Sequence, residues 1–250
     1  MDKLNPWDTL SQEFNTHTRA SEISPLAADN ILIAWPALLR GIHEAQPTGN
    51  GLSAMDFGCG AGSFCAALQD RGYAVTGCDT SDAMIKMARL NLADRGINFY
   101  KIDHSDLSAV KEAPFDLISA IMVLHFINNI TDMLRQLAAL LKPDGVLVFA
   151  VFNHDYVMAN HGEKRPFNGF DPQDPDNGFM TIGNDTRIPV FLRTEAEYDA
   201  MLEPLGFQRI FASEPPFTEE YINRYSDDTH DCSQPEYIIL GYRKLSPDDQ

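Results

Sequence analysis

The chain has 250 residues, with 36 acidic against 19 basic side chains and a net charge of −17 at pH 7. Nucleic-acid binding needs clustered Lys and Arg, and the sequence has no basic stripe, so the composition argues against a nucleic-acid partner. With 44% apolar residues the chain can build one domain core, and it has neither an apolar run of about 18 residues nor a signal-peptide pattern. We therefore expect a cytoplasmic protein without a membrane partner.

The first 50 residues predict a helical cap, with a helix from about Pro25 to Ala45. Ahead of this helix, the segment contains Trp7, Phe14 and Arg19. Trp7 and Phe14 are seven positions apart, so they either share one apolar helix face that packs on the core or contact a ligand. Both interpretations stay open.

A glycine-rich loop follows a short apolar strand at residues 52–57 and precedes a helix expected from Ser63 to Gly72. It reads Asp56-Phe-Gly58-Cys59-Gly60-Ala-Gly62. Glycines at alternate positions let the chain turn tightly and let a ligand approach the backbone. In a dinucleotide fingerprint the third glycine would fall on Ser63, and the acid that begins the loop suits a cationic ligand better than a pyrophosphate. The spacing disfavours NAD and favours a positively charged nucleoside.

A second strand is expected over residues 73–79, and it ends in Asp79, about 20 residues after the loop, where a ribose-binding carboxylate is expected. Thr80 and Met84 begin the next helix. A third strand, Ile97 to Ile102, leads into Asp103-His104-Ser105. Asp79 has a structural alternative as a turn or capping residue, but its place after the loop favours the ribose role.

The next segment, from Phe115 to Phe126, predicts a fourth strand and the loop beyond it, with Ile121, Met122 and His125 at its carboxyl end. Ligands collect at this edge of open α/β sheets. Residues 130–141 then form an amphipathic helix, a Lys-Pro-Asp-Gly turn follows at 142–145, and a fifth strand spans 146–152.

Taken in order, these elements resemble the class I S-adenosylmethionine (SAM) dependent methyltransferases, in the small-molecule branch of methyltransferase type 11 or UbiE-like proteins. The resemblance covers about residues 50–245 and is strongest over 54–152. It implies an α/β Rossmann-like, doubly wound sheet of seven strands in the order 3-2-1-4-5-7-6, with the last strand antiparallel. It also implies SAM as cofactor, held by Asp56, Gly58, Cys59, Gly60, Gly62, Asp79, Thr80, Met84, Asp103, His104, Ser105, Ile121, Met122 and His125.

The remaining segments are expected to select the substrate within a single domain, 1–250. We divide it into a cap (1–50), a SAM-binding core (51–152), a lid insertion (153–189) and a C-terminal helix with the last two strands (190–245). The insertion is rich in Pro, Gly and Asn and carries several aromatic residues, which favours a lid over a linker. Candidate substrate or lid residues are Trp7, Phe14, Arg19, Asn153, His154, Tyr156 and Phe170.

The expected reaction is in-line transfer of the sulfonium methyl group to a small-molecule acceptor, with the rate coming mainly from alignment. His125 and His154 are weak candidates for a general base, because each also fits a purely structural role. The four cysteines show no metal-binding spacing, so we expect free thiols and no metal. Alternatives are a SAM-binding protein without transfer activity, a modified-SAM chemistry and, less favoured, an NAD(P)-dependent oxidoreductase. Oligomeric state is not predicted.

Overall fold

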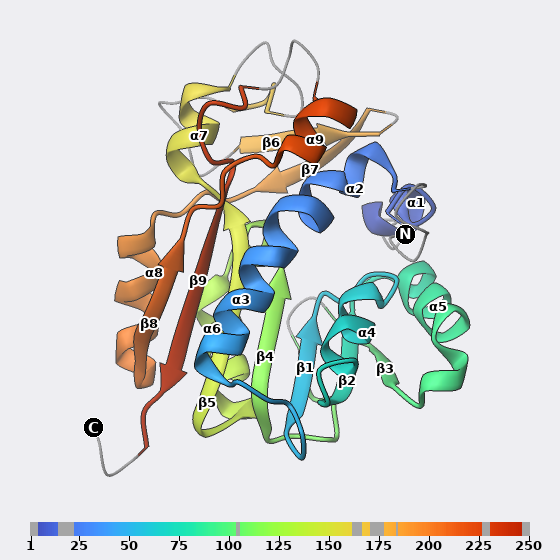
Figure 1. Ribbon diagram of the computed structural model, residues 1–250, viewed down its shortest axis with the longest axis vertical. Coiled ribbons are helices and arrows are strands. Elements are labelled where there is room, and N and C mark those ends of the chain that lie inside the picture. Colours follow the sequence, from blue (N-terminus) through green and yellow to red (C-terminus); the bar gives the residue numbers. More distant parts are fainter. Residues whose placement is uncertain are drawn as a thin grey trace.

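A seven-stranded sheet forms the centre of the molecule (Figure 1). The computed structural model describes residues 5–14, 23–103, 106–161, 167–170, 178–183, 185–226 and 231–246. The strands of this sheet are β1 (Ser53–Phe57), β2 (Ala74–Asp79), β3 (Asn98–Lys101), β4 (Phe115–Ile121), β5 (Leu141–Phe152), β8 (Phe207–Ser213) and β9 (Tyr237–Lys244).

The sheet order is β3-β2-β1-β4-β5-β9-β8. Neighbouring strands from β1 to β5 pair in parallel, whereas β9 runs antiparallel to both β5 and β8. Strands β6 (Gly178–Ile182) and β7 (Thr186–Val190) form a separate hairpin, so β8 and β9 are the sixth and seventh strands of the main sheet. The predicted order 3-2-1-4-5-7-6, with an antiparallel last strand, is therefore confirmed.

Helices cover both faces of the sheet. The α-helices are α1 (Pro6–Leu10), α2 (Pro25–Asp29), α3 (Trp35–Ala45), α4 (Ser63–Gln69), α5 (Asp82–Asn91), α6 (Ile130–Leu140), α7 (His154–Ala159), α8 (Glu195–Leu202) and α9 (Glu219–Arg224). Buried side chains of α3, α4 and α5 belong to one hydrophobic core, and those of α6 and α8 to another. Residues 146–152 of β5 alternate between these two cores, as expected for a strand whose successive side chains point to opposite faces.

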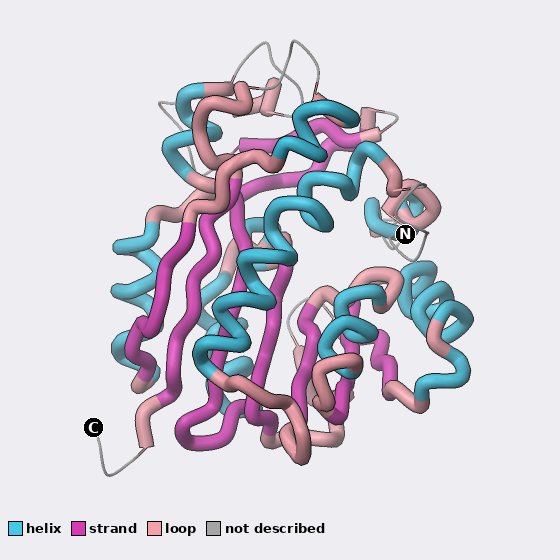
Figure 2. The backbone as a smooth tube through the Cα atoms, viewed as in Figure 1, coloured by secondary structure: helices cyan, strands magenta, loops and turns pink. Residues whose placement is uncertain are grey.

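The long N-terminal helix forms where it is predicted, but it is not uniform. A π-helix, Asn30–Ala34, joins α2 to α3, and the three segments form one continuous helix (Figure 2). Strand β5 also begins earlier than predicted, because Leu141 already pairs with Phe115 before the register shifts and Val146 pairs with Leu117. The predicted turn lies inside this irregular stretch, where Asp144 has a φ of 61°.

Several small elements gather beyond the carboxyl ends of the parallel strands. Figure 1 shows α1, α2, α7, α9 and the β6–β7 hairpin at this edge. The predictions for residues 153–189 include neither the hairpin nor α7. In the described part of the chain, no helix is both long and apolar enough to cross a membrane.

Candidate functional site

A cavity of about 1030 Å³ opens at the carboxyl ends of the parallel strands. Its wall combines the loops after β1, β2 and β4 with the N-terminal segment, the hairpin and α9. The residues proposed from sequence that line it are Trp7, Phe14, Asp56, Gly58, Cys59, Gly60, Asp79, Thr80, Met84, Asp103, Ile121 and Met122. The volume is at the upper end of ligand pockets, enough for more than one small molecule.

The glycine loop is pinned to the neighbouring strand by its own backbone. The amides of Gly58 and Cys59 both donate to the carbonyl oxygen of Cys78, at 2.8 and 3.0 Å. Gly58, Gly60 and Gly62 have φ values of 73°, 52° and 88°, a region that favours glycine.

The surroundings of the three glycines differ, and so does the reason that each position needs glycine. A Cβ on Gly58 would lie 2.2 Å from a methyl group of Val123, and one on Gly62 would lie 2.9 Å from Leu92. A Cβ on Gly60 would meet only the sulfur of Met84, at 3.9 Å, and Gly60 lines the cavity. Gly58 and Gly62 are therefore required for packing, whereas Gly60 leaves room for a ligand.

Asp79 is the last residue of β2, and its side chain is hydrogen-bonded to the glycine loop. One carboxylate oxygen accepts the Gly60 amide at 2.9 Å, and the other accepts the Ser81 amide at 2.8 Å. Burial raises the pKa of Asp79, and these hydrogen bonds partly offset that effect. A carboxylate has about four lone-pair sites, so Asp79 keeps acceptor capacity for a donor from a molecule in the cavity.

Asp56 lies at the base of the same loop and is only 2% exposed. Its carboxyl group accepts a hydrogen bond from the Ser119 hydroxyl at 2.7 Å and lies 3.6 Å from the Cys65 sulfur. Burial is the main reason that its pKa rises to about 7, and the nearby charge of Asp79 adds to it. A cationic ligand would stabilise the ionised carboxylate, because it supplies the missing opposite charge.

The loop after β4 contributes Ile121 and Met122 to the cavity. Met122 has a φ of 54°, uncommon for a residue with a side chain, and its amide donates to Ala150 at 2.9 Å. Strained backbone of this kind concentrates at ligand-binding sites, where the surrounding structure maintains it.

The N-terminal segment is fastened over the start of α5. The Asn5 side chain donates to the carbonyl of Thr80 at 2.8 Å, and Asp8 accepts the Ser81 hydroxyl at 2.6 Å and the Ala83 amide at 3.1 Å. Partial burial acts to raise the pKa of Asp8, but these hydrogen bonds lower it overall. The segment thereby covers the half of the cavity around the glycine loop.

Trp7 and Phe14 do not share a helix face, because α1 ends at Leu10. Their rings are in edge contact at 5.7 Å, and Trp7 also meets Phe126 at 5.1 Å. All three line the cavity, so packing and ligand contact are compatible here. Across from them, a Cβ on Gly183 in the hairpin would touch Glu13 and Leu10, which shows that the N-terminal segment and the hairpin meet.

Other proposed residues are not part of the cavity wall. Gly62, His125, Asn153, His154, Tyr156 and Phe170 are not among its lining residues. Tyr156 and Phe170 are buried and both make ring contacts with Phe167, so they pack the insertion. Arg19, His104 and Ser105 lie outside the described residues.

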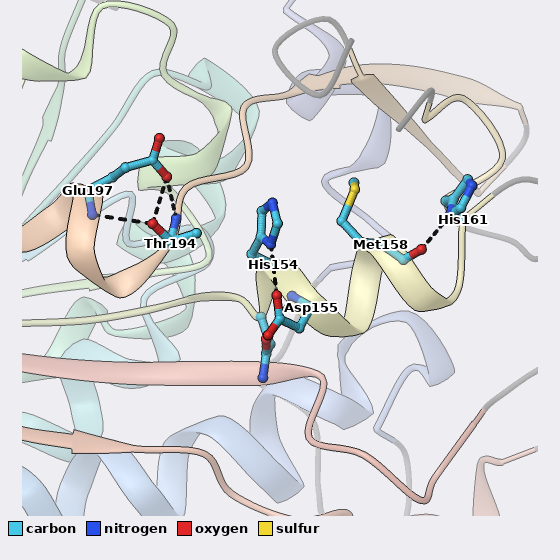
Figure 3. Close-up of polar contacts among 7 residues, drawn as sticks. His154, Asp155, Met158, His161, Thr194 and Glu197 are labelled. Atoms are coloured by element: carbon cyan, nitrogen blue, oxygen red, sulfur yellow. Dashed lines mark hydrogen bonds and ion pairs between the residues drawn. The ribbon is translucent and has the colours of Figure 1, made fainter. Parts of the chain in front are cut away.

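His154 lies on the first turn of α7, which Asn153 caps by accepting the Asp155 amide at 3.0 Å. Its Nδ1 is 3.0 Å from the Asp155 carboxylate (Figure 3). The same view shows the capping box of Thr194 and Glu197 at the start of α8. His154 remains only a sequence-based candidate for catalysis, and nothing in its contacts points toward the cavity.

His125 is 1% exposed, and its ring lies against Phe126 and Phe152, at 4.1 and 4.5 Å between centroids. Neither ring nitrogen has a hydrogen-bond partner among the described residues. Burial, with a smaller contribution from the charge of Arg193, lowers the His125 pKa to about 3. The imidazole is therefore neutral at physiological pH.

We expect His125→Phe to protect the protein against acid. The folded protein holds His125 neutral, whereas the unfolded chain protonates it below its ordinary pKa of 6.5, so wild-type stability falls as the pH drops from 6.5 toward 3. At pH 5 the variant should regain up to about 2 kcal/mol. Urea unfolding at pH 5 and pH 8 measures this; an equal effect of the substitution at both pH values would contradict it.

Sequence reasoning missed a polar group at the far end of the cavity: Asp29, Asn30, Tyr221, Tyr225 and Glu236. Asp29 and Asn30 lie inside a helix that the sequence predicts to be regular. Glu236 is an isolated acid directly before an apolar strand. Its only sequence signal is that an antiparallel last strand begins at the carboxyl edge of the sheet, where ligands bind.

Comparison with known proteins agrees with this arrangement. The model of a protein family described as "Methyltransferase domain" matches residues 25–210 of this chain. The ubiquinone biosynthesis O-methyltransferase of Stutzerimonas stutzeri is 33% identical over 142 residues, which are 55% of this chain and 57% of that protein. The protein of the same name from Coxiella burnetii is 30% identical over 156 residues, 62% and 63% of the two chains.

Among solved structures, an S-adenosylmethionine dependent methyltransferase from Listeria monocytogenes, itself described as putative, superimposes with a TM-score of 0.66 at 19% identity. The match covers 84% of this chain and 98% of that one. This likeness shows the fold. The chain spans little more than half the length of the curated relatives it matches.

Proposed function

This chain belongs to the methyltransferase-domain family, and from that premise we propose that it transfers a methyl group from SAM to a small-molecule acceptor bound in the same cavity. The observation that carries the proposal is Asp79, whose carboxylate lines the cavity beside Gly60 and keeps acceptor capacity beyond its backbone hydrogen bonds. A ribose with two neighbouring hydroxyl donors fits that arrangement.

Other residues of the wall fit the rest of the cofactor. Asp56 and Asp103 add carboxyl groups to the half of the cavity around the glycine loop. SAM is a net cation, and carboxylates that lose water on binding gain most from an opposite charge. Met84, Ile102 and Phe57 provide apolar surface in the same half. We propose that these groups hold SAM and direct its methyl group toward Phe152 and the hairpin.

SAM supplies an activated methyl group and a good leaving group. The protein's contribution is then to align the acceptor and to exclude water. The N-terminal segment and the β6–β7 hairpin meet over the cavity, which supports a role for both in closing it. His125 is buried outside the wall, so we assign no proton transfer to it.

Calorimetric titration with SAM, S-adenosylhomocysteine and NADH tests the cofactor. We expect micromolar binding of the two sulfur nucleosides and none of NADH; binding of NADH alone would overturn the proposal. An acceptor library incubated with SAM and assayed for S-adenosylhomocysteine then tests transfer. Nucleoside binding without turnover on any acceptor would favour the alternative, a SAM-binding protein without transfer activity.

A further inference from the structure

The far end of the cavity brings together two acidic side chains from distant parts of the chain. Asp29 is the last residue of α2, and Glu236 directly precedes β9. The next residue, Tyr237, pairs with Phe152 at the carboxyl end of β5, and its hydroxyl donates to the Asp29 carboxylate. Both acids line the cavity, on the side away from the glycine loop.

Within the described part of the chain, no hydrogen bond or ion pair explains the burial of the Glu236 side chain. It is 5% exposed, and its Oε2 atom has no hydrogen-bond partner among the described residues. The side-chain oxygen of Asn30, which also lines the cavity, is another buried acceptor without a partner there. Unpaired buried acceptors are rare in native proteins because each loses its bonds to water. Two of them on one cavity wall call for a ligand that brings hydrogen-bond donors.

The charge of the wall specifies what kind of donor is needed. Burial first, and the charge of Asp29 second, raise the pKa of Glu236 well above its usual range. The described residues of the wall include five carboxyl groups, Asp29, Asp56, Asp79, Asp103 and Glu236, and no Lys, Arg or His. Three of the five lie around the glycine loop, and the other two, Asp29 and Glu236, lie at the far end.

Three further features support a cationic ligand site at this end of the cavity. The rings of Phe152, Tyr221 and Tyr225 line the same cavity, and aromatic faces attract ammonium groups. A π-helix begins at Asn30, directly after Asp29, and such turns are frequent at functional sites. The net charge of −17 also favours the approach of a cationic small molecule over that of an anionic one.

We propose that Asp29, Asn30 and Glu236 form a subsite for a protonated amine of the acceptor molecule. In this arrangement the ammonium group donates to Glu236 and Asn30 and lies near the charge of Asp29. The subsite deepens the proposed methyl transfer, since it names the acceptor class as a small aromatic or aliphatic amine. It selects against acceptors that carry a carboxylate at this position, because three oxygen acceptors would face an anion.

The test uses three probes of similar size: 2-phenylethylamine, 2-phenylethanol and 3-phenylpropanoate. Each is titrated calorimetrically into the protein saturated with S-adenosylhomocysteine. We expect the amine to bind at least roughly tenfold more tightly than either partner probe. In Glu236→Gln the amine should lose at least roughly tenfold in affinity, while the alcohol stays within about twofold.

Glu219→Gln is the matched control, because it makes the same change at an exposed position on α9. It should leave all three affinities unchanged. Asp29→Asn is a second variant in case Glu236→Gln does not fold, which far-UV circular dichroism would show. The proposal is overturned if the amine is not preferred, or if its preference persists in a folded variant at either position. If the protein binds neither SAM nor S-adenosylhomocysteine, the same titrations are made without nucleoside. An amine preference that depends on Glu236 would then support the subsite and refute the proposed function.

Discussion

Gly60→Val is expected to lower the affinity for SAM by more than about 100-fold, because the new side chain would occupy the space of the ligand. A Cβ at this position points into the cavity and meets nothing closer than the Met84 sulfur at 3.9 Å. The protein itself therefore has room for the valine. The φ of 52° adds backbone strain of about 1–3 kcal/mol, which lowers stability without unfolding the domain.

Gly96→Val separates the two effects. Gly96 has a similar φ of 66°, and a Cβ there meets nothing within 4 Å, but it is not part of the cavity wall. We expect both variants to lose similar stability in urea unfolding and only Gly60→Val to lose calorimetric binding of SAM. Normal SAM affinity in folded Gly60→Val would mean that the cofactor does not cross the loop at this glycine.

Asp79→Asn is expected to weaken SAM binding by about 100-fold, the loss of one or two hydrogen bonds to a charged group. The carboxylate already accepts the amides of Gly60 and Ser81. Asparagine has an NH₂ group in place of one carboxylate oxygen. That donor would face a backbone N–H, which is also a donor. We therefore expect the variant to lose about 1–3 kcal/mol of stability as well as the proposed ribose contact.

Asp82→Asn is the control for this experiment, since it changes the same side chain at an exposed position three residues along the chain. It removes an acid from the first turn of α5 and should cost no more than about 1 kcal/mol. SAM affinity should stay at the wild-type value. If folded Asp79→Asn bound SAM as well as Asp82→Asn does, Asp79 would have no role in holding the ribose.

The order of the strands could be predicted, and so could the cavity lining around the glycine loop, because each depends on local patterns. The elements that form this part of the cavity are close together in the sequence: Gly58, Gly60, Gly62 and Asp79, with the strand that ends at Asp79. Parallel strands then place their carboxyl ends at one edge of the sheet. The helix cap at Thr194 is predictable for the same reason, since its partner is three residues away.

Long-range contacts are what the sequence leaves open. His125 follows a strand that ends at the site, yet its ring is buried against Phe126 and Phe152. Tyr156 and Phe170 look like lid aromatics but pack on Phe167. Sequence position shows that such a side chain is near the edge of the sheet, but only packing decides whether it turns toward the cavity or away from it.

The sequence by itself determined the class of fold, the glycine loop and the acid after the second strand, Asp79. These features need only neighbouring residues and the periodicity of strands. The tertiary structure decided which residues line the far end of the cavity, where we propose that the acceptor binds. Asp29 and Glu236 are more than 200 residues apart, and they meet only because β9 inserts beside β5 and the π-helix of the N-terminal segment lies over that edge. No local pattern encodes their proximity, because it depends on how distant strands and helices pack in the folded chain.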